Sequence, residues 1–137
     1  MSMVLDASAT ISWFFADEHS EAAHAVLRRV AAEGATVPSL WRLEVANVFR
    51  GAVRRLRCDQ AYADESLRRL SRFAITVDPE TDGRAWGETR ALSLEEDLTL
   101  YDASYLELAL RTNAPLASRD MDLVAAARRR RVEVIEA

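Results

Sequence analysis

Lysine is absent from this chain of 137 residues, and all 18 of its basic residues are arginines. A phosphate-binding P-loop is therefore excluded, because it needs a lysine, and so is Schiff-base chemistry, which needs an amine. The single cysteine, Cys58, excludes an internal disulfide framework and a cysteine-based metal site. No apolar run approaches the ~18 residues that span a bilayer, and the N-terminal segment lacks the features of a signal peptide. We expect a cytoplasmic protein that does not insert into a membrane.

Glycine and proline are also scarce, with four and three residues, and no linker, repeat or low-complexity segment interrupts the chain. Half of the residues are apolar and 29% are charged, which is typical of a globular protein that buries a substantial core. The formal net charge is −4. We therefore expect one domain that spans residues 1–137.

Short apolar segments alternate with longer segments of helical periodicity along the whole chain. We expect strands at Met3–Leu5, Ala35–Val37, Ala74–Val77, Pro115–Ala117 and Val132–Ile135. We expect helices at Ala9–Phe15, Ser20–Glu33, Leu40–Arg57, Gln60–Phe73, Thr81–Leu94, Asp102–Arg111 and Met121–Arg130. Strands separated by helices form parallel sheets with right-handed crossovers. The pattern predicts an α/β fold, a three-layer sandwich around a small parallel β-sheet of about four to five strands.

Two aspartates stand where ligands bind in folds of this kind, beyond the carboxyl ends of parallel strands. Asp6 directly follows the first expected strand, and Asp120 lies three residues after the fourth. If these two strands are neighbours in the sheet, the two carboxylates converge. Each aspartate also has a structural interpretation, since each could simply cap the helix that follows it.

Two further acids, Glu44 and Asp102, interrupt segments that are otherwise dominated by apolar and aromatic residues. Asn47 lies about one helical turn after Glu44 and shares its face. A buried charge needs a partner. An arginine such as Arg42 or Arg119 could form a salt bridge with either acid. Alternatively, the two acids could share a cation with the aspartates at the strand ends.

These four carboxylates, with no histidine or cysteine beside them, form an oxygen-rich set of possible ligands. Such a set favours hard cations such as Mg²⁺ or Mn²⁺ over Zn²⁺ or copper. The charge balance agrees, because removing four acids from the 22 in the chain leaves 18, which equals the number of arginines. Carboxylate sites that hold one or two such ions activate water in phosphodiester cleavage. The sequence therefore favours metal-dependent hydrolysis of a phosphodiester.

Four short motifs, taken in order, resemble those of the PIN-domain ribonucleases, and most of all the VapC-type toxins of bacterial toxin–antitoxin pairs. Each motif is weak alone, but together they span nearly the whole chain at typical spacing. The matching segments are Val4–Ser8, Pro38–Asn47, Leu100–Ala109 and Leu116–Asp120. The resemblance implies a PIN-like sheet in which the first and fourth strands lie side by side.

The resemblance also implies roles for individual residues. Metal binding and catalysis are implied for four acids: Asp6, Glu44, Asp102 and Asp120. The implied cofactor is Mg²⁺ or Mn²⁺. Asn47 and Ser118 would be supporting polar groups, and many relatives carry threonine at the position of Ser118. Asp122 is an additional acid that could be an outer ligand or a first-turn residue favoured by the helix dipole.

The function implied by the resemblance is a divalent-metal-dependent endoribonuclease that acts as the toxin of a toxin–antitoxin pair. It would cleave structured RNA, such as tRNA or rRNA, by attack of water on a phosphodiester. The implied partners are a VapB-like antitoxin that blocks the site, the RNA substrate and a second copy of the chain in a homodimer. The alternatives are a housekeeping RNA-processing nuclease of the same fold and a catalytically silent PIN-like binding module.

A phospho-acceptor signalling domain would also place an acid after the first strand. Receiver domains need a lysine, which this chain lacks, and the dehalogenase pattern needs a second aspartate where Ser8 stands. This class is therefore disfavoured. Three groups of arginines could contact phosphates or could be solvated helix faces. They are Arg50 with Arg54 and Arg57, Arg68 with Arg69 and Arg72, and the run Arg128–Arg131.

Overall fold

The computed structural model describes residues 2–137, and in this range it contains one five-stranded sheet. Its strands are β1 (Met3–Leu5), β2 (Ala35–Val37), β3 (Ile75–Val77), β4 (Leu116–Ser118) and β5 (Val134–Glu136). They lie in the order β3-β2-β1-β4-β5, and each neighbouring pair is parallel. The predicted parallel sheet is confirmed, and its first and fourth strands lie side by side as the resemblance implies.

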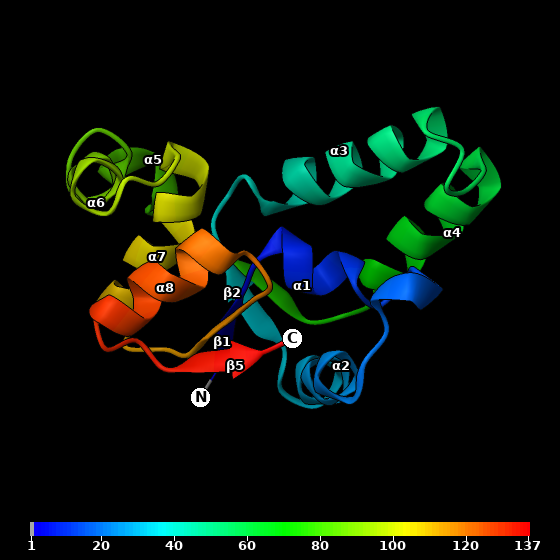
Figure 1. Ribbon diagram of the computed structural model, residues 1–137, viewed down its shortest axis with the longest axis horizontal. Coiled ribbons are helices and arrows are strands. Elements are labelled where there is room, and N and C mark those ends of the chain that lie inside the picture. Colours follow the sequence, from blue (N-terminus) through cyan, green and yellow to red (C-terminus); the bar gives the residue numbers. More distant parts are fainter. Residues whose placement is uncertain (1) are drawn as a thin grey trace.

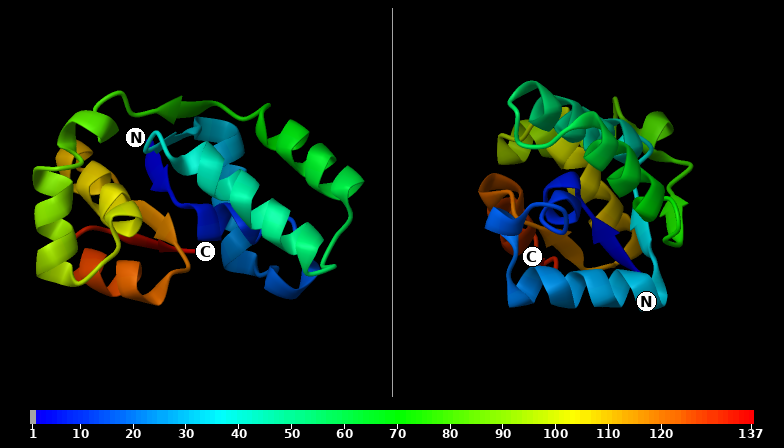
Figure 2. Two further views of the ribbon diagram at one scale, coloured as in Figure 1. Left: turned by 90° about the horizontal axis from the view of Figure 1, so that it is seen from above. Right: turned by 90° about the vertical axis from the view of Figure 1, so that its right-hand side faces the viewer.

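The helices of the described chain cover both faces of this sheet. They are α1 (Ala7–Ile11), α2 (Glu21–Glu33), α3 (Trp41–Arg54), α4 (Gln60–Leu70), α5 (Thr81–Arg84), α6 (Glu88–Glu96), α7 (Leu100–Thr112) and α8 (Met121–Arg129), with a short 3-10 helix at Ala16–Glu18. Helices α7 and α8 lie on one side of the sheet and α1 and α2 on the other, while α3 and α4 form a pair that projects away from it (Figure 1, Figure 2). The predicted three-layer sandwich is confirmed. No helix within residues 2–137 has the length and apolar character that crossing a membrane requires.

The centre of the sheet is its most protected part. Every residue of β1 and β4 is buried, whereas the edge strands β3 and β5 are partly exposed. Strands that are covered on both faces by helices read as continuous apolar runs, which is how β1 appears in the sequence. The residues that follow the carboxyl ends of β1 and β4 are therefore attached to the buried centre of the sheet.

The turn between α2 and β2 depends on Gly34. Its φ is +77°, and a Cβ at this position would lie 2.4 Å from the carbonyl oxygen of Ala74. Its backbone N–H donates to the carbonyl of Val30 at 2.8 Å and closes α2. Glycine is therefore required here by its positive φ and by the close approach of Ala74.

The predicted helix Thr81–Leu94 is wrong as a single element, because α5 and α6 are separate helices. Gly87, which precedes α6, has φ −100° and ψ −105°, a conformation outside the helical region. The neighbouring Trp86 is 92% exposed, so its apolar character does not mark a buried helical stripe. The apolar periodicity therefore predicted one continuous helix, whereas α5 ends before the non-helical backbone of Gly87 and α6 begins after it.

The predicted helix Ala9–Phe15 is also wrong in its bounds. Helix α1 begins two residues earlier, at Ala7, because Asp6 caps it, and it ends at Ile11. Helix α7 likewise begins before its predicted start, since the side chain of Thr99 caps it by accepting a hydrogen bond from the Asp102 backbone. In both cases a capping side chain sets the first turn.

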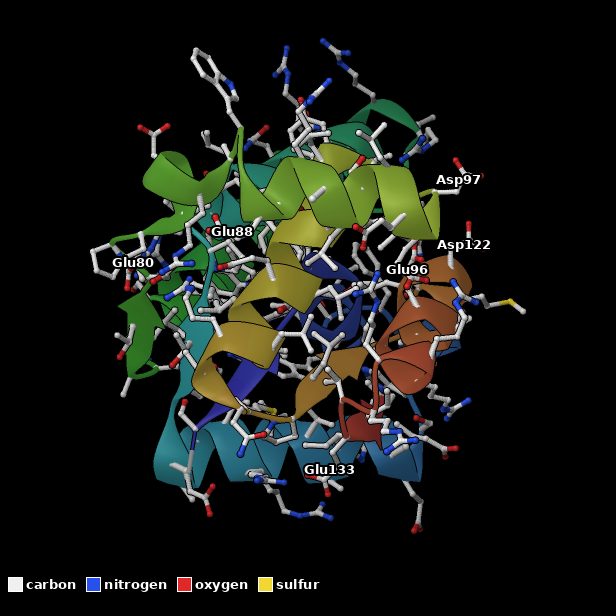
Figure 3. The ribbon with its side chains drawn as sticks, turned by 90° about the vertical axis from the view of Figure 1, so that its left-hand side faces the viewer. Glu80, Glu88, Glu96, Asp97, Asp122 and Glu133 are labelled. Carbon is white, nitrogen blue, oxygen red and sulfur yellow. The ribbon has the colours of Figure 1, made fainter. Side chains whose placement is uncertain are left out.

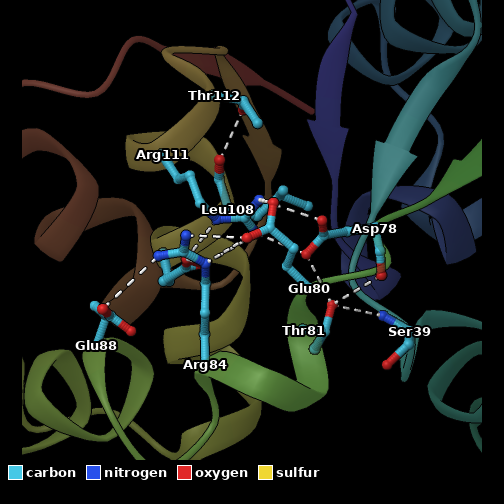
Figure 4. Close-up of polar contacts among 10 residues, drawn as sticks. Ser39, Asp78, Glu80, Thr81, Arg84, Glu88, Leu108, Arg111 and Thr112 are labelled. Carbon is cyan, nitrogen blue, oxygen red and sulfur yellow. Dashed lines mark hydrogen bonds and ion pairs between the residues drawn. The ribbon is translucent and has the colours of Figure 1, made fainter.

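An ionic network joins α5 and α7 to the end of β3 (Figure 4). Arg111 of α7 contacts Asp78 at 2.6 Å and Glu107 at 2.7 Å. Arg84 of α5 contacts Glu80 at 3.0 Å and approaches Glu107 at 3.6 Å. We call these five residues the Arg84–Arg111 network. It fixes α7, which carries one of the candidate site residues, against the edge of the sheet.

Candidate active site

Asp6 lies at the carboxyl end of β1 with only 4% of its surface exposed. Its Oδ1 accepts hydrogen bonds from the Ala9 backbone at 2.9 Å and from the Ser8 hydroxyl at 2.7 Å. Its Oδ2 accepts one from the Ser118 hydroxyl at 2.5 Å. The carboxylate is therefore held rigidly by three neutral donors, one of them from the end of the neighbouring strand β4.

Ser118 connects Asp6 to Asp120. Its hydroxyl oxygen, which donates to Asp6, accepts a hydrogen bond from the Asp120 backbone at 3.0 Å. Asp120 in turn caps α8, because its Oδ1 accepts from the Leu123 backbone at 2.9 Å. The convergence predicted for the two aspartates is confirmed, and both aspartates also cap helices. The capping interpretation is therefore confirmed for both aspartates, and capping is compatible with a shared site.

Glu44 and Asp102 approach the same place from α3 and α7. Glu44 is partly buried, and its Oε1 accepts a hydrogen bond from the hydroxyl of Tyr105. Asp102 lies in the first turn of α7 and is also partly buried. Tyr105 follows Asp102 by one helical turn, so one face of α7 supplies both an acid and a hydroxyl donor.

Three of these acids have raised pKa values, and the charge of a neighbouring acid contributes to each shift. Burial, together with the charge of Asp120, raises the pKa of Asp6. Burial, together with the charge of Asp6, raises the pKa of Glu44. For Asp102, burial and then the charges of Asp120, Asp6 and Glu44 raise the pKa to about 6. We call Asp6, Glu44, Asp102 and Asp120 the acid cluster, since each carboxylate lies within electrostatic reach of another.

No member of the acid cluster forms an ion pair within residues 2–137. Arg119 contacts Glu18 at 3.2 Å, and the guanidinium of Arg42 lies 6.0 Å from the ring centroid of Trp41. The predicted alternative, a salt bridge from one of these arginines to Glu44 or Asp102, is therefore absent. Charge that is partly buried and uncompensated favours the binding of a cation.

The donor set of the acid cluster fits a hard divalent cation, because every charged ligand in it is a carboxylate. Among residues 2–137, however, no three His, Cys, Asp or Glu side chains already surround a position suitable for a metal ion. Both oxygens of Asp6 and one of Glu44 are held by hydrogen bonds, and the like charges repel. The acid cluster is thus an open group of ligands rather than a closed cage.

The two remaining predicted polar positions lie outside these contacts. Asn47 is exposed on α3, one turn after Glu44, with no side-chain hydrogen bond among the described residues. Asp122 is exposed in the first turn of α8, on the outer surface of the molecule (Figure 3). This is the position that the helix-dipole interpretation of Asp122 requires.

The hydroxyl groups around the acid cluster are the part of the site that sequence reasoning missed, apart from Ser118. They belong to Ser8 and Tyr105, which donate to acids of the cluster, and to Thr99, which accepts from the Asp102 backbone. Their positions relative to the acids carried a signal. Ser8 follows Asp6 by two residues, and Thr99 and Tyr105 flank Asp102 at the one-turn spacing of a helix.

The arginine groups are partly neutralised. Arg57 contacts Asp17 at 2.9 Å, and Arg68 pairs with Glu65. At the C-terminal end of α8, Arg129 and Arg130 both contact Glu96, each at 2.7 Å, and Figure 3 shows Glu96 lying over that helix. These arginines are therefore engaged within the chain, and the remaining ones keep both of their predicted interpretations.

Comparison with known proteins places this chain in a family. The family model for the PIN domain matches residues 3–129. Ribonuclease VapC9 of Mycobacterium tuberculosis is 32% identical over 123 residues, which cover 88% of this chain and 87% of the relative. Ribonuclease VapC3 of Pyrobaculum aerophilum is 28% identical over 123 residues, covering 90% and 92%.

Solved structures have the same fold. A crystal structure of a Pyrobaculum aerophilum protein has a TM-score of 0.69 and 28% identity, with 92% of this chain and 84% of that chain covered. The Rickettsia felis VapBC2 complex, bound to promoter DNA, gives a TM-score of 0.66 at 15% identity, with 100% and 99% covered. With a matching family model over most of its length and a relative above 30% identity, this chain belongs to the PIN-domain family, in the group of the VapC ribonucleases.

Proposed function

We propose that residues 1–137 form one PIN domain that acts as a divalent-metal-dependent endoribonuclease, with Mg²⁺ or Mn²⁺ held by the acid cluster. The observation that carries this proposal is the convergence of four carboxylates that have no arginine partner within residues 2–137, in a chain with 18 arginines. The names of the VapC relatives support RNA as the substrate. Structured RNA with an unpaired loop, as in tRNA or rRNA, is the substrate class we propose.

In this proposal the chain's own residues hold and orient the ligands. Ser8, Ser118 and the α1 backbone fix Asp6, and the first turn of α8 fixes Asp120. Glu44 and Asp102 complete the set from the two flanking helices. A bound Mg²⁺ or Mn²⁺ supplies Lewis-acid activation of water and offsets charge on the leaving oxygen.

Water is the nucleophile in this proposal, because no lysine, histidine or cysteine within residues 2–137 forms a hydrogen bond with a member of the acid cluster. The chain has no lysine, and His19 and His24 are exposed. Cys58 lines a hollow with Phe14 and Tyr62 that contains no member of the acid cluster. Direct attack by water leaves a 5′-phosphate and a 3′-hydroxyl, since the RNA 2′-hydroxyl takes no part.

We further propose that the protein is the toxin of a toxin–antitoxin pair, that it forms a homodimer and that a VapB-like antitoxin blocks the acid cluster. An arginine or lysine side chain inserted among uncompensated carboxylates would neutralise them as a metal ion does. Co-expression with the neighbouring gene should yield a complex without nuclease activity. A complex that cleaves RNA at the full rate would instead favour a housekeeping RNA-processing nuclease.

End-group analysis of total cellular RNA after incubation with the purified protein tests the activity. We expect cleavage that stops with EDTA, returns with Mg²⁺ or Mn²⁺ and leaves 5′-phosphates. Asp6→Asn and Asp120→Asn should each reduce the rate about a hundredfold or more, while asparagine keeps the helix caps. Asp59→Asn is the matched control, because Asp59 also caps a helix but lies outside the acid cluster.

Three results would contradict the proposal. They are cleavage without a divalent ion, 2′,3′-cyclic phosphate ends, and undiminished rates in both acid-cluster variants. A protein that folds and binds RNA but never cleaves it would indicate a silent binding module. The Asp59→Asn control separates loss of activity from loss of the fold.

A further inference from the structure

Tyr105 is the largest fully buried side chain of the described residues, with 1% of its surface exposed. Its ring lies in the core on α7, and its hydroxyl donates a hydrogen bond to Oε1 of Glu44 on α3. The hydroxyl also lies within electrostatic reach of Asp6 and Asp102. This phenol therefore contacts one member of the acid cluster and lies within electrostatic reach of two more.

Glu44 needs such a contact more than Asp6 and Asp120 do. The backbone N–H groups of helix first turns hold Asp6 and Asp120, but the hydrogen bond that the structure gives the Glu44 side chain is the one from Tyr105. Glutamate has a long side chain with several rotatable bonds. The charges of Asp6 and Asp102 repel it, and its neighbour Leu43 on α3 is 76% exposed. Without the phenol, the Glu44 carboxylate would turn toward solvent.

We propose that Tyr105 is a positioning residue for Glu44, an inference that rests on the proposed function of the acid cluster. The hydroxyl occupies Oε1 and so fixes the carboxylate, while Oε2 remains available as a cation ligand. A neutral donor is suited to this role, because an arginine at the same place would hold Glu44 equally well but would also neutralise it. Tyr105 thus fixes the position of the Glu44 carboxylate without neutralising its charge.

The test is a double-mutant cycle in which the affinity for Mn²⁺ is measured by calorimetry. Tyr105→Phe removes the hydroxyl alone and should weaken Mn²⁺ binding roughly tenfold, as is usual for a group that orients a metal ligand. Glu44→Gln should weaken binding by at least as much. If Tyr105 acts through Glu44, adding Tyr105→Phe to the Glu44→Gln protein should change the affinity less than about twofold.

Tyr62→Phe is the matched control, since it removes a tyrosine hydroxyl that donates to the Phe14 carbonyl and has no contact with the acid cluster. It should leave Mn²⁺ affinity unchanged. Thermal unfolding of each metal-free variant shows whether it is folded. A purely structural role for the Tyr105 hydroxyl would lower the unfolding temperature while leaving the Mn²⁺ affinity of the folded protein unchanged, and that result would overturn the inference.

The outcomes separate this inference from the proposed function. If Glu44→Gln weakens Mn²⁺ binding and Tyr105→Phe does not, the inference fails and the metal site stands. The inference also fails if the two losses are additive. If Glu44→Gln and Asp6→Asn both leave Mn²⁺ binding unchanged, the proposed metal site itself fails. Should Tyr105→Phe not fold, Glu44→Asp draws the carboxylate back from the phenol at constant charge, and wild-type affinity in that variant would overturn the inference.

Discussion

Asp6 and Asp78 each follow the last residue of a strand, β1 and β3, and they are equally buried, with 4% and 5% of their surfaces exposed. Their surroundings differ in charge. Asp78 contacts Arg111 at 2.6 Å, and although burial opposes ionisation, hydrogen bonds from Arg111, the Glu80 backbone and Thr81 lower its pKa. Asp6 receives neutral donors only, and its pKa is raised.

The same contrast occurs within one helix, α7. Glu107 is buried and contacts Arg111, which lies one turn further along, at 2.7 Å. Asp102, near the start of the helix, contacts no arginine, and its pKa is raised to about 6. The neighbours of the two acids differ in charge. Arg111 and, at 3.6 Å, Arg84 of α5 contact Glu107. The charged neighbours of Asp102 are further acids, namely Asp120 before α8, Asp6 before α1 and Glu44 on α3.

The comparison shows two ways of fixing a carboxylate. In the Arg84–Arg111 network, position and charge are satisfied together, so the acids serve the fold. In the acid cluster, hydroxyls and backbone N–H groups fix position and leave the charge uncompensated. Charge left in this way is costly in the free protein and is useful only if a cation from outside the chain binds there.

The largest expected effect comes from breaking the paired group. Arg111→Met keeps the apolar part of the side chain and removes the charge, which leaves Asp78 buried without its cation and Glu107 with only the more distant Arg84. We expect a loss of about 3 kcal/mol of unfolding free energy, measured by urea denaturation at neutral pH. Arg68→Met, which removes an exposed pair with Glu65, is the control and should change stability by less than about 0.5 kcal/mol. Equal effects of the two substitutions would contradict the distinction drawn here.

A smaller effect, of opposite sign, is expected from the acid cluster. Below about pH 4, Asp102 is protonated in both the folded and the unfolded chain and has little effect on stability. As the pH rises from the ordinary aspartate value of 3.8 to the folded pKa of about 6, the unfolded chain loses this proton while the folded chain keeps it, so the metal-free protein loses stability, and the loss is complete above the folded pKa. Asp102→Asn avoids that cost and should therefore stabilise the metal-free protein at neutral pH, by about 1 kcal/mol after allowance for solvent screening.

Urea denaturation in EDTA at about pH 4 and about pH 7.5 checks this sign. The gain from Asp102→Asn should appear only at the higher pH. Asp64→Asn, an exposed acid on α4, should show no such difference between the two conditions. A destabilised Asp102→Asn protein at neutral pH would place Asp102 among the structural acids, with Glu107.

Much of the fold could be predicted because the strands are short, apolar and separated by amphipathic helices. The segment after β3 shows the limit. Trp86 and the residues around it continue an apolar periodicity, but Trp86 is exposed and Gly87 breaks the helix. Periodicity reports which residues are apolar, and it cannot report that a particular apolar side chain faces solvent.

Candidate site residues could be predicted where a charged residue interrupts an apolar segment. They could not be predicted where the residue type is common in a protein core. Glu44 and Asp102 stand out because charge is rare in apolar segments. Tyr105 does not stand out, since a tyrosine fits a core whether or not its hydroxyl has a function. The ion pair between Asp78 and Arg111 could not be predicted either, because the two residues are 33 positions apart along the chain.

The smallest expected effect concerns Asp122, which decides how far the acid cluster extends. It lies in the first turn of α8, two residues after Asp120, and it is exposed (Figure 3). A carboxylate there interacts favourably with the helix dipole, so Asp122→Asn should lower the unfolding free energy by about 0.5 kcal/mol, an effect that salt should weaken. Mn²⁺ affinity should remain within about twofold of wild type, whereas Asp120→Asn should weaken it tenfold or more. A loss of Mn²⁺ affinity in Asp122→Asn comparable to that in Asp120→Asn would make Asp122 a fifth ligand, because a dipole interaction at an exposed helix end has no means of changing the affinity of a site that it does not touch.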